Sequence, residues 1–192
     1  MTPGGAGSGA AFGTGFPRMG AFWLLMSGVL DILDGKVARR SGMVSNFGAF
    51  FDSTLDRLGE AALFTGIAIY FVTTAEQRWP ILGLGASLLA LSGSFLVSYT
   101  RARAEGLGLD CKVGLAQRPE RIVGLGVPTL GFGAGSQGWL LLGLMLALAL
   151  ANTITVIQRI AHVYRLTVPQ GRGSGPEDAV PAALLDAAPR GR

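Results

Sequence analysis

The stretch Asp31–Asp56, DILDGKVARRSGMVSNFGAFFDSTLD, decides the fold. Its acidic residues come in two pairs, because Asp31 and Asp34 are three apart and Asp52 and Asp56 are four apart. On an α-helix, either spacing places both carboxylates of a pair on one face. Apolar segments flank the stretch, AFWLLMSGVL before it and AALFTGIAIYF after it. The stretch therefore predicts two apolar helices whose neighbouring ends each carry a pair of carboxylates.

Carboxylates in such apolar surroundings indicate a functional site. Inserting one of them into a bilayer costs about 2.5–3.5 kcal/mol, and four close together repel one another unless a cation lies among them. Oxygen ligands suit hard divalent cations, so Mg²⁺ is the expected metal, with Mn²⁺ or Ca²⁺ as alternatives. Helix capping or ion pairs with neighbouring basic residues would account for one or two of the carboxylates. The expected metal ligands are all four: Asp31, Asp34, Asp52 and Asp56.

Composition places the chain among membrane proteins. Its 192 residues are 49% hydrophobic and only 15% charged, and the mean hydropathy is +0.46. The formal net charge of +4 would also suit nucleic-acid binding. However, the basic residues gather at the ends of apolar segments, as in membrane proteins, so no nucleic-acid partner is expected. The single cysteine, Cys111, excludes a disulfide framework within the chain.

Five apolar segments predict an all-α, polytopic membrane helical bundle of about five transmembrane helices. They cover about residues 16–39, 47–74, 80–103, 120–135 and 137–166. One transmembrane domain is therefore expected over residues 16–166. The Gly-rich residues 1–15 are expected to be flexible or weakly helical, and the Pro-, Gly- and Ala-rich residues 167–192 to form a disordered cytoplasmic tail.

The charges also predict an orientation in the cell membrane. If the five segments alternate in direction, all but two of the basic residues between residues 16 and 166 lie on one side, and only Arg18 and Arg78 lie on the other. The richly basic side is expected to be cytoplasmic. The aspartates would then lie at the cytoplasmic edge of the bilayer in a multi-pass membrane protein.

The central stretch also resembles a known family. It reads D-x2-D-G-x2-A-R-x8-G-x3-D-x3-D, the signature of the CDP-alcohol phosphatidyltransferases, and a looser similarity extends from about residue 16 to residue 165. The resemblance implies transfer of a phosphatidyl group from CDP-diacylglycerol to an alcohol, with release of CMP. It also implies a homodimer and six transmembrane helices, one more than the segments above. The matching positions are Asp31, Asp34, Gly35, Ala38, Arg39, Gly48, Asp52 and Asp56.

The resemblance assigns roles to these positions. The four aspartates would hold two divalent ions, and Asp56 would also be the general base that activates the acceptor hydroxyl. Gly35, Arg39 and Ser45 would bind the CDP part of the donor. Gly48 and Ala38 are small enough for the nucleotide and the helix backbones to approach closely. Ser45 has a second interpretation, because it could equally be the N-cap of the helix that follows.

The acceptor site is predicted from arginines outside the signature. SYTRARAE covers residues 98–105, RPER covers residues 118–121, and Arg159 lies in the last apolar segment. Arginine clusters bind phosphate dianions, so the acceptor alcohol is expected to be phosphorylated. The pattern resembles the phosphatidylinositol-phosphate synthase branch, whose acceptor is inositol 1-phosphate. That resemblance implies a phosphate pocket of Ser98, Arg101, Arg121 and Arg159. Anchoring to anionic lipid head groups is the competing interpretation for other arginines here.

Three other functions remain open from the sequence. Glycerol 3-phosphate is the alternative acceptor, because it also carries a phosphate. A cation transporter or channel could use intramembrane carboxylates, although all four lie near one end of their segments. Finally, the chain could be an inactive, truncated homologue that lacks the first helix of the family.

Overall fold

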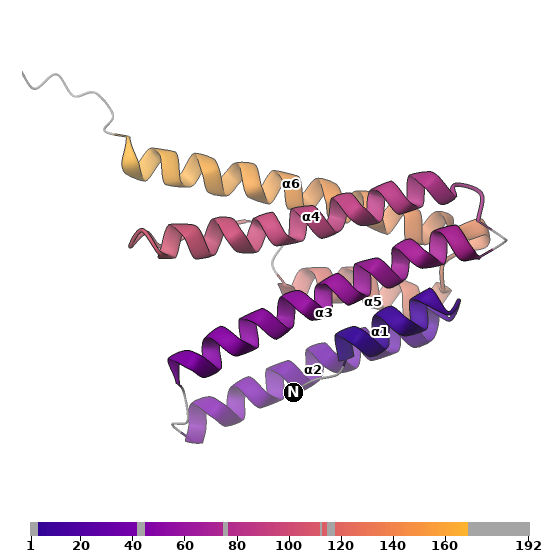
Figure 1. The fold of residues 1–192 in the computed structure, drawn as a ribbon, viewed down its shortest axis with the longest axis horizontal. Helices are drawn as coiled ribbons and strands as arrows, with labels where there is room; N and C mark the ends of the chain where they lie inside the picture. Colours follow the sequence, from indigo (N-terminus) through magenta and orange to yellow (C-terminus); the bar gives the residue numbers. More distant parts are fainter. Residues whose placement is uncertain (1–3, 42–44, 75–76, 112, 115–117, 169–192) are drawn as a thin grey trace, which may run out of the picture.

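A computed structural model describes residues 4–41, 45–74, 77–111, 113–114 and 118–168, without the side chains of residues 32, 34–41 and 118. Helices are the only regular secondary structure in the described part, as predicted, and it contains no strand. Figure 1 shows the helices as a bundle. Their bounds are α1 Gly4–Gly13, α2 Pro17–Ser41, α3 Asn46–Thr73, α4 Pro80–Glu105, α5 Arg118–Phe132, the 3₁₀-helix η1 Ser136–Gly138 and α6 Trp139–Thr167.

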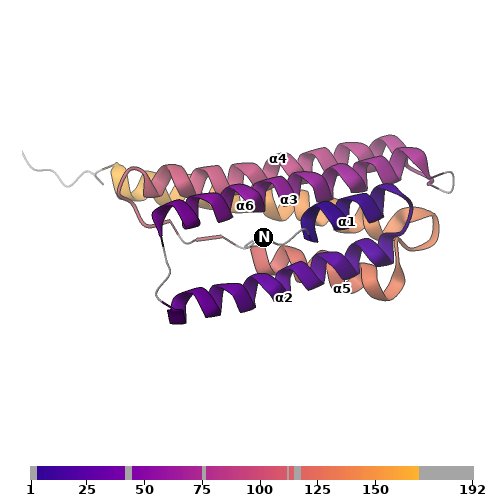
Figure 2. The same ribbon diagram turned by 60° about the horizontal axis from the view of Figure 1, so that its bottom comes forward.

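The five long helices, α2 to α6, confirm the five apolar segments. α3, α4 and α6 form one layer, α2 and α5 form a second, and α1 lies between α2 and α3 (Figure 2). The buried core connects both layers through Phe12 of α1, Leu24 of α2, Ile67 of α3, Leu125 of α5 and Met145 of α6. As predicted, the C-terminal end of α2 and the N-terminal end of α3 lie at the same end of the bundle (Figure 1).

The N-terminal segment, which was expected to be flexible or weakly helical, contains helix α1. Residues 4–13 are helical, and Phe12 is fully buried. Small residues bring this helix into backbone contact with α3: a Cβ added to Gly9 would lie 2.1 Å from the Ala62 carbonyl oxygen, and one added to Gly66 would lie 2.0 Å from the Gly9 carbonyl oxygen. In membrane proteins small residues favour close helix packing. The glycines that suggested flexibility therefore form a helix–helix interface.

Two described helical segments are long and apolar enough to cross a membrane. They are Pro80–Glu105, with mean hydropathy 1.9, and Ser136–Thr167, with mean hydropathy 2.3. Only 39% and 28% of their most apolar stretches are buried inside the protein. Large apolar side chains point outward along both, for example Leu89 at 64% exposure and Leu150 at 63%. Such apolar surface is suited to contact with lipid rather than with water.

Candidate active site

The signature aspartates lie within α2 and α3, because Asp31 is ten residues before Ser41, the last residue of α2, and Asp52 is six residues after Asn46, the first residue of α3. Asp31 is half-buried on α2, whereas on α3 Asp52 is exposed and Asp56 is half-buried. Among the residues that the structure describes, no group of three or more acidic, histidine or cysteine residues is placed to hold a metal ion. The fourth expected ligand, Asp34, is part of helix α2, but its side chain lies outside the described residues. The four-carboxylate metal site therefore stays a prediction.

The first turn of α3 has a regular N-cap. Ser45 has extended backbone angles, and its hydroxyl oxygen accepts a hydrogen bond from the Gly48 amide at 3.0 Å. This is the capping interpretation of Ser45, and it orients the helix that carries Asp52 and Asp56. A Cβ added to Gly48 would lie 3.0 Å from the Ser45 hydroxyl oxygen, so a small residue suits the cap. The other predicted nucleotide residues, Gly35, Ala38 and Arg39, lie outside the part of the chain whose side chains are described.

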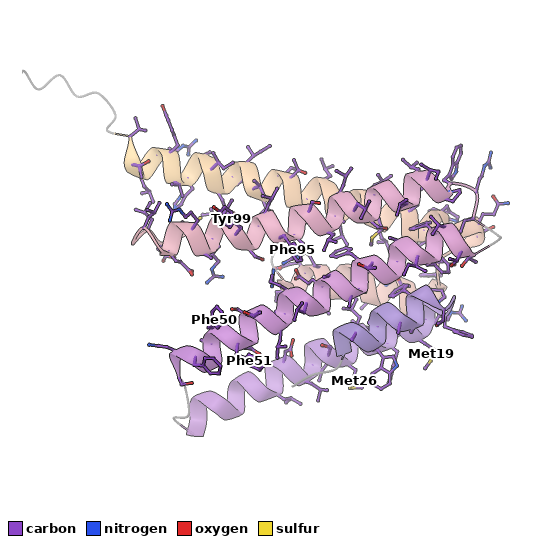
Figure 3. All side chains as sticks on the ribbon, in the orientation of Figure 1. Met19, Met26, Phe50, Phe51, Phe95 and Tyr99 are labelled. Carbon is purple, nitrogen blue, oxygen red and sulfur yellow. The ribbon has the colours of Figure 1, made fainter. Side chains whose placement is uncertain are left out.

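A pocket of about 740 Å³ opens beside the aspartate-bearing turns of α3. It brings together all four residues predicted for the acceptor phosphate, which come from α4, α5 and α6. Two aromatic residues that line it, Phe95 and Tyr99, lie in the C-terminal half of α4 (Figure 3). The same figure labels Phe50 and Phe51, which lie near the N-terminal end of α3. The lining residues are Ser53, Thr54, Arg57, Phe95, Val97, Ser98, Tyr99, Arg101, Ala102, Glu105, Pro119, Arg121 and Arg159.

Arg159 is held by the protein backbone. It is only 4% exposed on α6. Its Nε donates to the Val113 carbonyl at 2.9 Å, and its Nη1 donates to the Val97 carbonyl of α4. Carbonyl oxygens orient a guanidinium without neutralising its charge, so Arg159 brings a positive charge to the pocket.

Arg101 is the most exposed of the four arginines that line the pocket. Its Nε donates to Glu105 Oε1 at 2.8 Å, one turn along α4, and the two side chains are 47% and 50% exposed. Exposed ion pairs of this kind contribute little to stability. Arg101 can therefore exchange its glutamate partner for a bound anion at small cost.

A second ion-pair network lies deeper and was not predicted. Glu60 of α3 contacts Arg57 Nη1 at 3.0 Å and Arg121 Nη1 at 3.4 Å. Ser94 of α4 donates to Glu60 and accepts from Arg121, and Ser98 accepts from Arg57. Sequence reasoning assigned Arg57 only to membrane orientation or to pairing with an aspartate, and it gave Glu60 no role. The available signal was Glu60 itself, an acidic residue one helical turn after Asp56 in an apolar segment.

The fold and the pocket define a helical membrane protein with carboxylates and buried arginines at one end of its bundle. This arrangement suits an enzyme that acts on phosphate groups at the bilayer surface. The chain belongs to the CDP-alcohol phosphatidyltransferase family, whose model matches residues 10–161. It is therefore a transferase of a family of membrane enzymes, and the resemblance in the central stretch is confirmed.

Its relatives include synthases of two kinds of membrane lipid. It is 40% identical over 156 residues to an archaetidylinositol phosphate synthase of Methanothermobacter thermautotrophicus, covering 81% of this chain and 75% of the relative. It is also 40% identical over 142 residues to a phosphatidylinositol phosphate synthase of Cutibacterium acnes, covering 70% and 67%.

Solved structures of one relative share the fold. The phosphatidylinositol phosphate synthase of Mycobacterium tuberculosis with bound CDP-DAG superposes with a TM-score of 0.73 at 33% identity, covering 91% of this chain and 87% of that one. The same enzyme in complex with manganese and citrate gives a TM-score of 0.74 at 32% identity, covering 93% and 87%.

Proposed function

We propose that this chain transfers the phosphatidyl group of CDP-diacylglycerol to inositol 1-phosphate and releases CMP. The observation that carries the proposal is the arginine-lined pocket beside the turns of α3 that hold Asp52 and Asp56. The relatives named above differ in their lipid, archaetidyl or phosphatidyl, but both names contain inositol phosphate. This shared part favours inositol phosphate over glycerol 3-phosphate as the acceptor.

The proposed reaction is a single displacement at phosphorus. The acceptor hydroxyl attacks the phosphorus atom that carries the diacylglycerol, an O–P bond forms, and the bond to the CMP phosphate breaks. Asp56 takes the hydroxyl proton, and the arginines of the pocket hold the acceptor by its phosphate. Bringing both substrates together at one membrane edge supplies much of the rate enhancement.

We further propose that Asp31, Asp34, Asp52 and Asp56 hold the divalent metal. Their all-oxygen donor set fits Mg²⁺ or Mn²⁺, and one relative crystallised with manganese. A bound divalent cation would neutralise charge on the donor pyrophosphate. Two ions and a preference for Mg²⁺ belong to the same proposal.

The proposed topology is multi-pass with the pocket facing the cytoplasm. Its support is the concentration of basic residues at the pocket end of the bundle, which the positive-inside rule places on that side. We also propose a homodimer in the membrane. Cβ atoms added to Gly124 and Gly131 of α5 would meet nothing within 4 Å. This helix therefore offers small residues against which a second copy could pack.

An acceptor panel tests the proposed reaction. Purified protein with CDP-diacylglycerol and Mg²⁺ is expected to release CMP with inositol 1-phosphate, but not with inositol, because inositol leaves the arginines without an anion. Chelation by EDTA should stop CMP release, and Mg²⁺ or Mn²⁺ should restore it. Release with glycerol 3-phosphate alone would change the assigned acceptor. Metal-ion flux into liposomes without CMP release would favour the transporter.

Replacing Arg159 with glutamine tests the acceptor site. The variant is expected to raise the KM for inositol 1-phosphate roughly 10- to 100-fold, because a charge-assisted hydrogen bond contributes about 1.5–3 kcal/mol. Arg165→Gln is the matched control, since Arg165 is exposed on the same helix and does not line the pocket. Steady-state kinetics with varied acceptor measure both variants. An unchanged KM in Arg159→Gln would remove this arginine from the acceptor site.

A further inference from the structure

Glu60 lies between two arginines of the pocket and is largely enclosed. Its side chain is 13% exposed on α3, one turn beyond Asp56. One oxygen, Oε2, is 3.0 Å from Arg57 Nη1, and the other, Oε1, is 3.4 Å from Arg121 Nη1. Ser94 donates a hydrogen bond to Oε2 at 2.5 Å. The carboxylate therefore joins α3, α4 and α5 at the wall of the pocket.

These contacts fix the direction of two guanidinium groups. Arginine has five N–H donors on a planar fork, and Glu60 engages one nitrogen of each arginine. Ser98 accepts from Arg57 and Ser94 accepts from Arg121, which restricts the arginines further. A carboxylate that holds two ligand-binding side chains in one geometry lowers the entropy lost when an anion binds.

The charge of the pocket also fits a phosphate monoester. Four arginines line it, and ion pairs of the described residues link three of them to Glu60 or Glu105, so these six residues together carry a formal charge of +2. A phosphate monoester carries about −1.5 to −2 at pH 7. Without Glu60 the surplus would exceed the charge of the ligand, and two partly buried arginines would repel each other.

We propose that Glu60 is a positioning residue of this pocket, which holds Arg57 and Arg121 in the geometry that binds the phosphate of the acceptor. The inference rests on the proposed function, and it adds Arg57 to the residues that contact that phosphate. Glu60 acts through the two arginines and does not touch the substrate. Its effect should therefore fall on the acceptor and not on the lipid donor.

Glu60→Gln tests the proposal, because it removes the charge and keeps the size of the side chain. The KM for inositol 1-phosphate is expected to rise about tenfold, while kcat and the KM for CDP-diacylglycerol change little. The melting temperature should fall, because Arg57 and Arg121 lose their shared carboxylate. Glu120→Gln is the matched control. It removes the same charge from an exposed position on α5 next to Arg121, outside the pocket lining, and should leave the KM for the acceptor unchanged.

Two more variants distinguish positioning from general stabilisation. Glu60→Asp keeps the charge but withdraws it by one methylene, so a smaller rise of about threefold in the same KM is expected. Arg57→Gln should also raise the KM for inositol 1-phosphate about tenfold. The double variant Glu60→Gln with Arg57→Gln should raise this KM little further, because the effects of residues that act as a unit do not add. Additive effects, or equal rises in both KM values, would overturn the proposal. If Glu60→Gln does not fold, an unchanged KM in Glu60→Asp overturns it equally.

A binding measurement separates this proposal from the proposed function. Inositol 1-phosphate, or inorganic phosphate, is expected to raise the melting temperature of the wild-type protein without any donor, and at the same ligand concentration this rise should be clearly smaller in Glu60→Gln. If the wild type shows the rise but transfers nothing to inositol 1-phosphate, the proposed function fails and the role of Glu60 stands. An equal rise in both proteins would overturn the role of Glu60 even if the enzyme is active.

Discussion

Replacing Asp56 with asparagine is expected to reduce CMP release by roughly 10³-fold or more. General-base catalysis contributes about 10²–10⁴-fold on its own, and asparagine also lacks the charge that a metal ligand supplies. Asp56 lies half-buried on α3, and the pocket-lining Thr54 and Arg57 are its close neighbours in that helix. The measurement is CMP release with saturating CDP-diacylglycerol, inositol 1-phosphate and Mg²⁺.

Asp110→Asn is the control for this variant. Asp110 is an exposed acid in the loop after α4, outside both the signature and the pocket lining. It should keep wild-type activity, and both variants should keep the wild-type melting temperature. Substantial CMP release by a folded Asp56→Asn protein would exclude Asp56 as the base and as an essential ligand.

Replacing Gly66 with valine is expected to separate α1 from α3. A Cβ at residue 66 would lie 2.0 Å from the carbonyl oxygen of Gly9, and a backbone atom cannot rotate away as a side chain can. Overpacking of this kind costs about 1–3 kcal/mol or more. For a chain of this size the melting temperature in detergent should fall by roughly 5–10 °C. Proteolysis of the α1 segment should become faster.

Gly143→Val is the matched control. Gly143 is exposed on α6, and a Cβ added there would meet nothing within 4 Å. Glycine and valine differ little in helix propensity, so the melting temperature should stay near the wild-type value. If both variants lower it equally, the loss would come from the helix backbone and not from the contact between α1 and α3.

The helical bundle and the arginines of the pocket could be predicted from local patterns in the sequence. The five long helices follow from apolar segments bounded by charged residues, a pattern that each segment displays by itself. The clustering of arginines on one membrane face pointed to a phosphorylated acceptor, and the family resemblance grouped Ser98, Arg101, Arg121 and Arg159, which do line one pocket. The ligand set of the metal remains a prediction, since Asp34 lies outside the described side chains.

What sequence reasoning missed depends on contacts between distant segments. The glycines of α1 are as typical of a flexible linker as of a packed helix, and only Ala62 and Gly66 of α3 decide between the two. Glu60 is similarly ambiguous. Its role depends on Arg121, 61 positions further along the chain, and on Ser94 of the helix between them.

Arg159 has a consequence for how this protein can vary. The groups that orient it are the main-chain oxygens of Val97 and Val113, which every amino acid provides. Substitutions at those two positions can therefore leave the guanidinium in place as long as the local path of the chain is kept. A mutational scan should find the half-buried Val113 tolerant of side-chain changes while Arg159 itself is intolerant. The support of the Arg159 guanidinium would thus be invisible in any comparison of side chains.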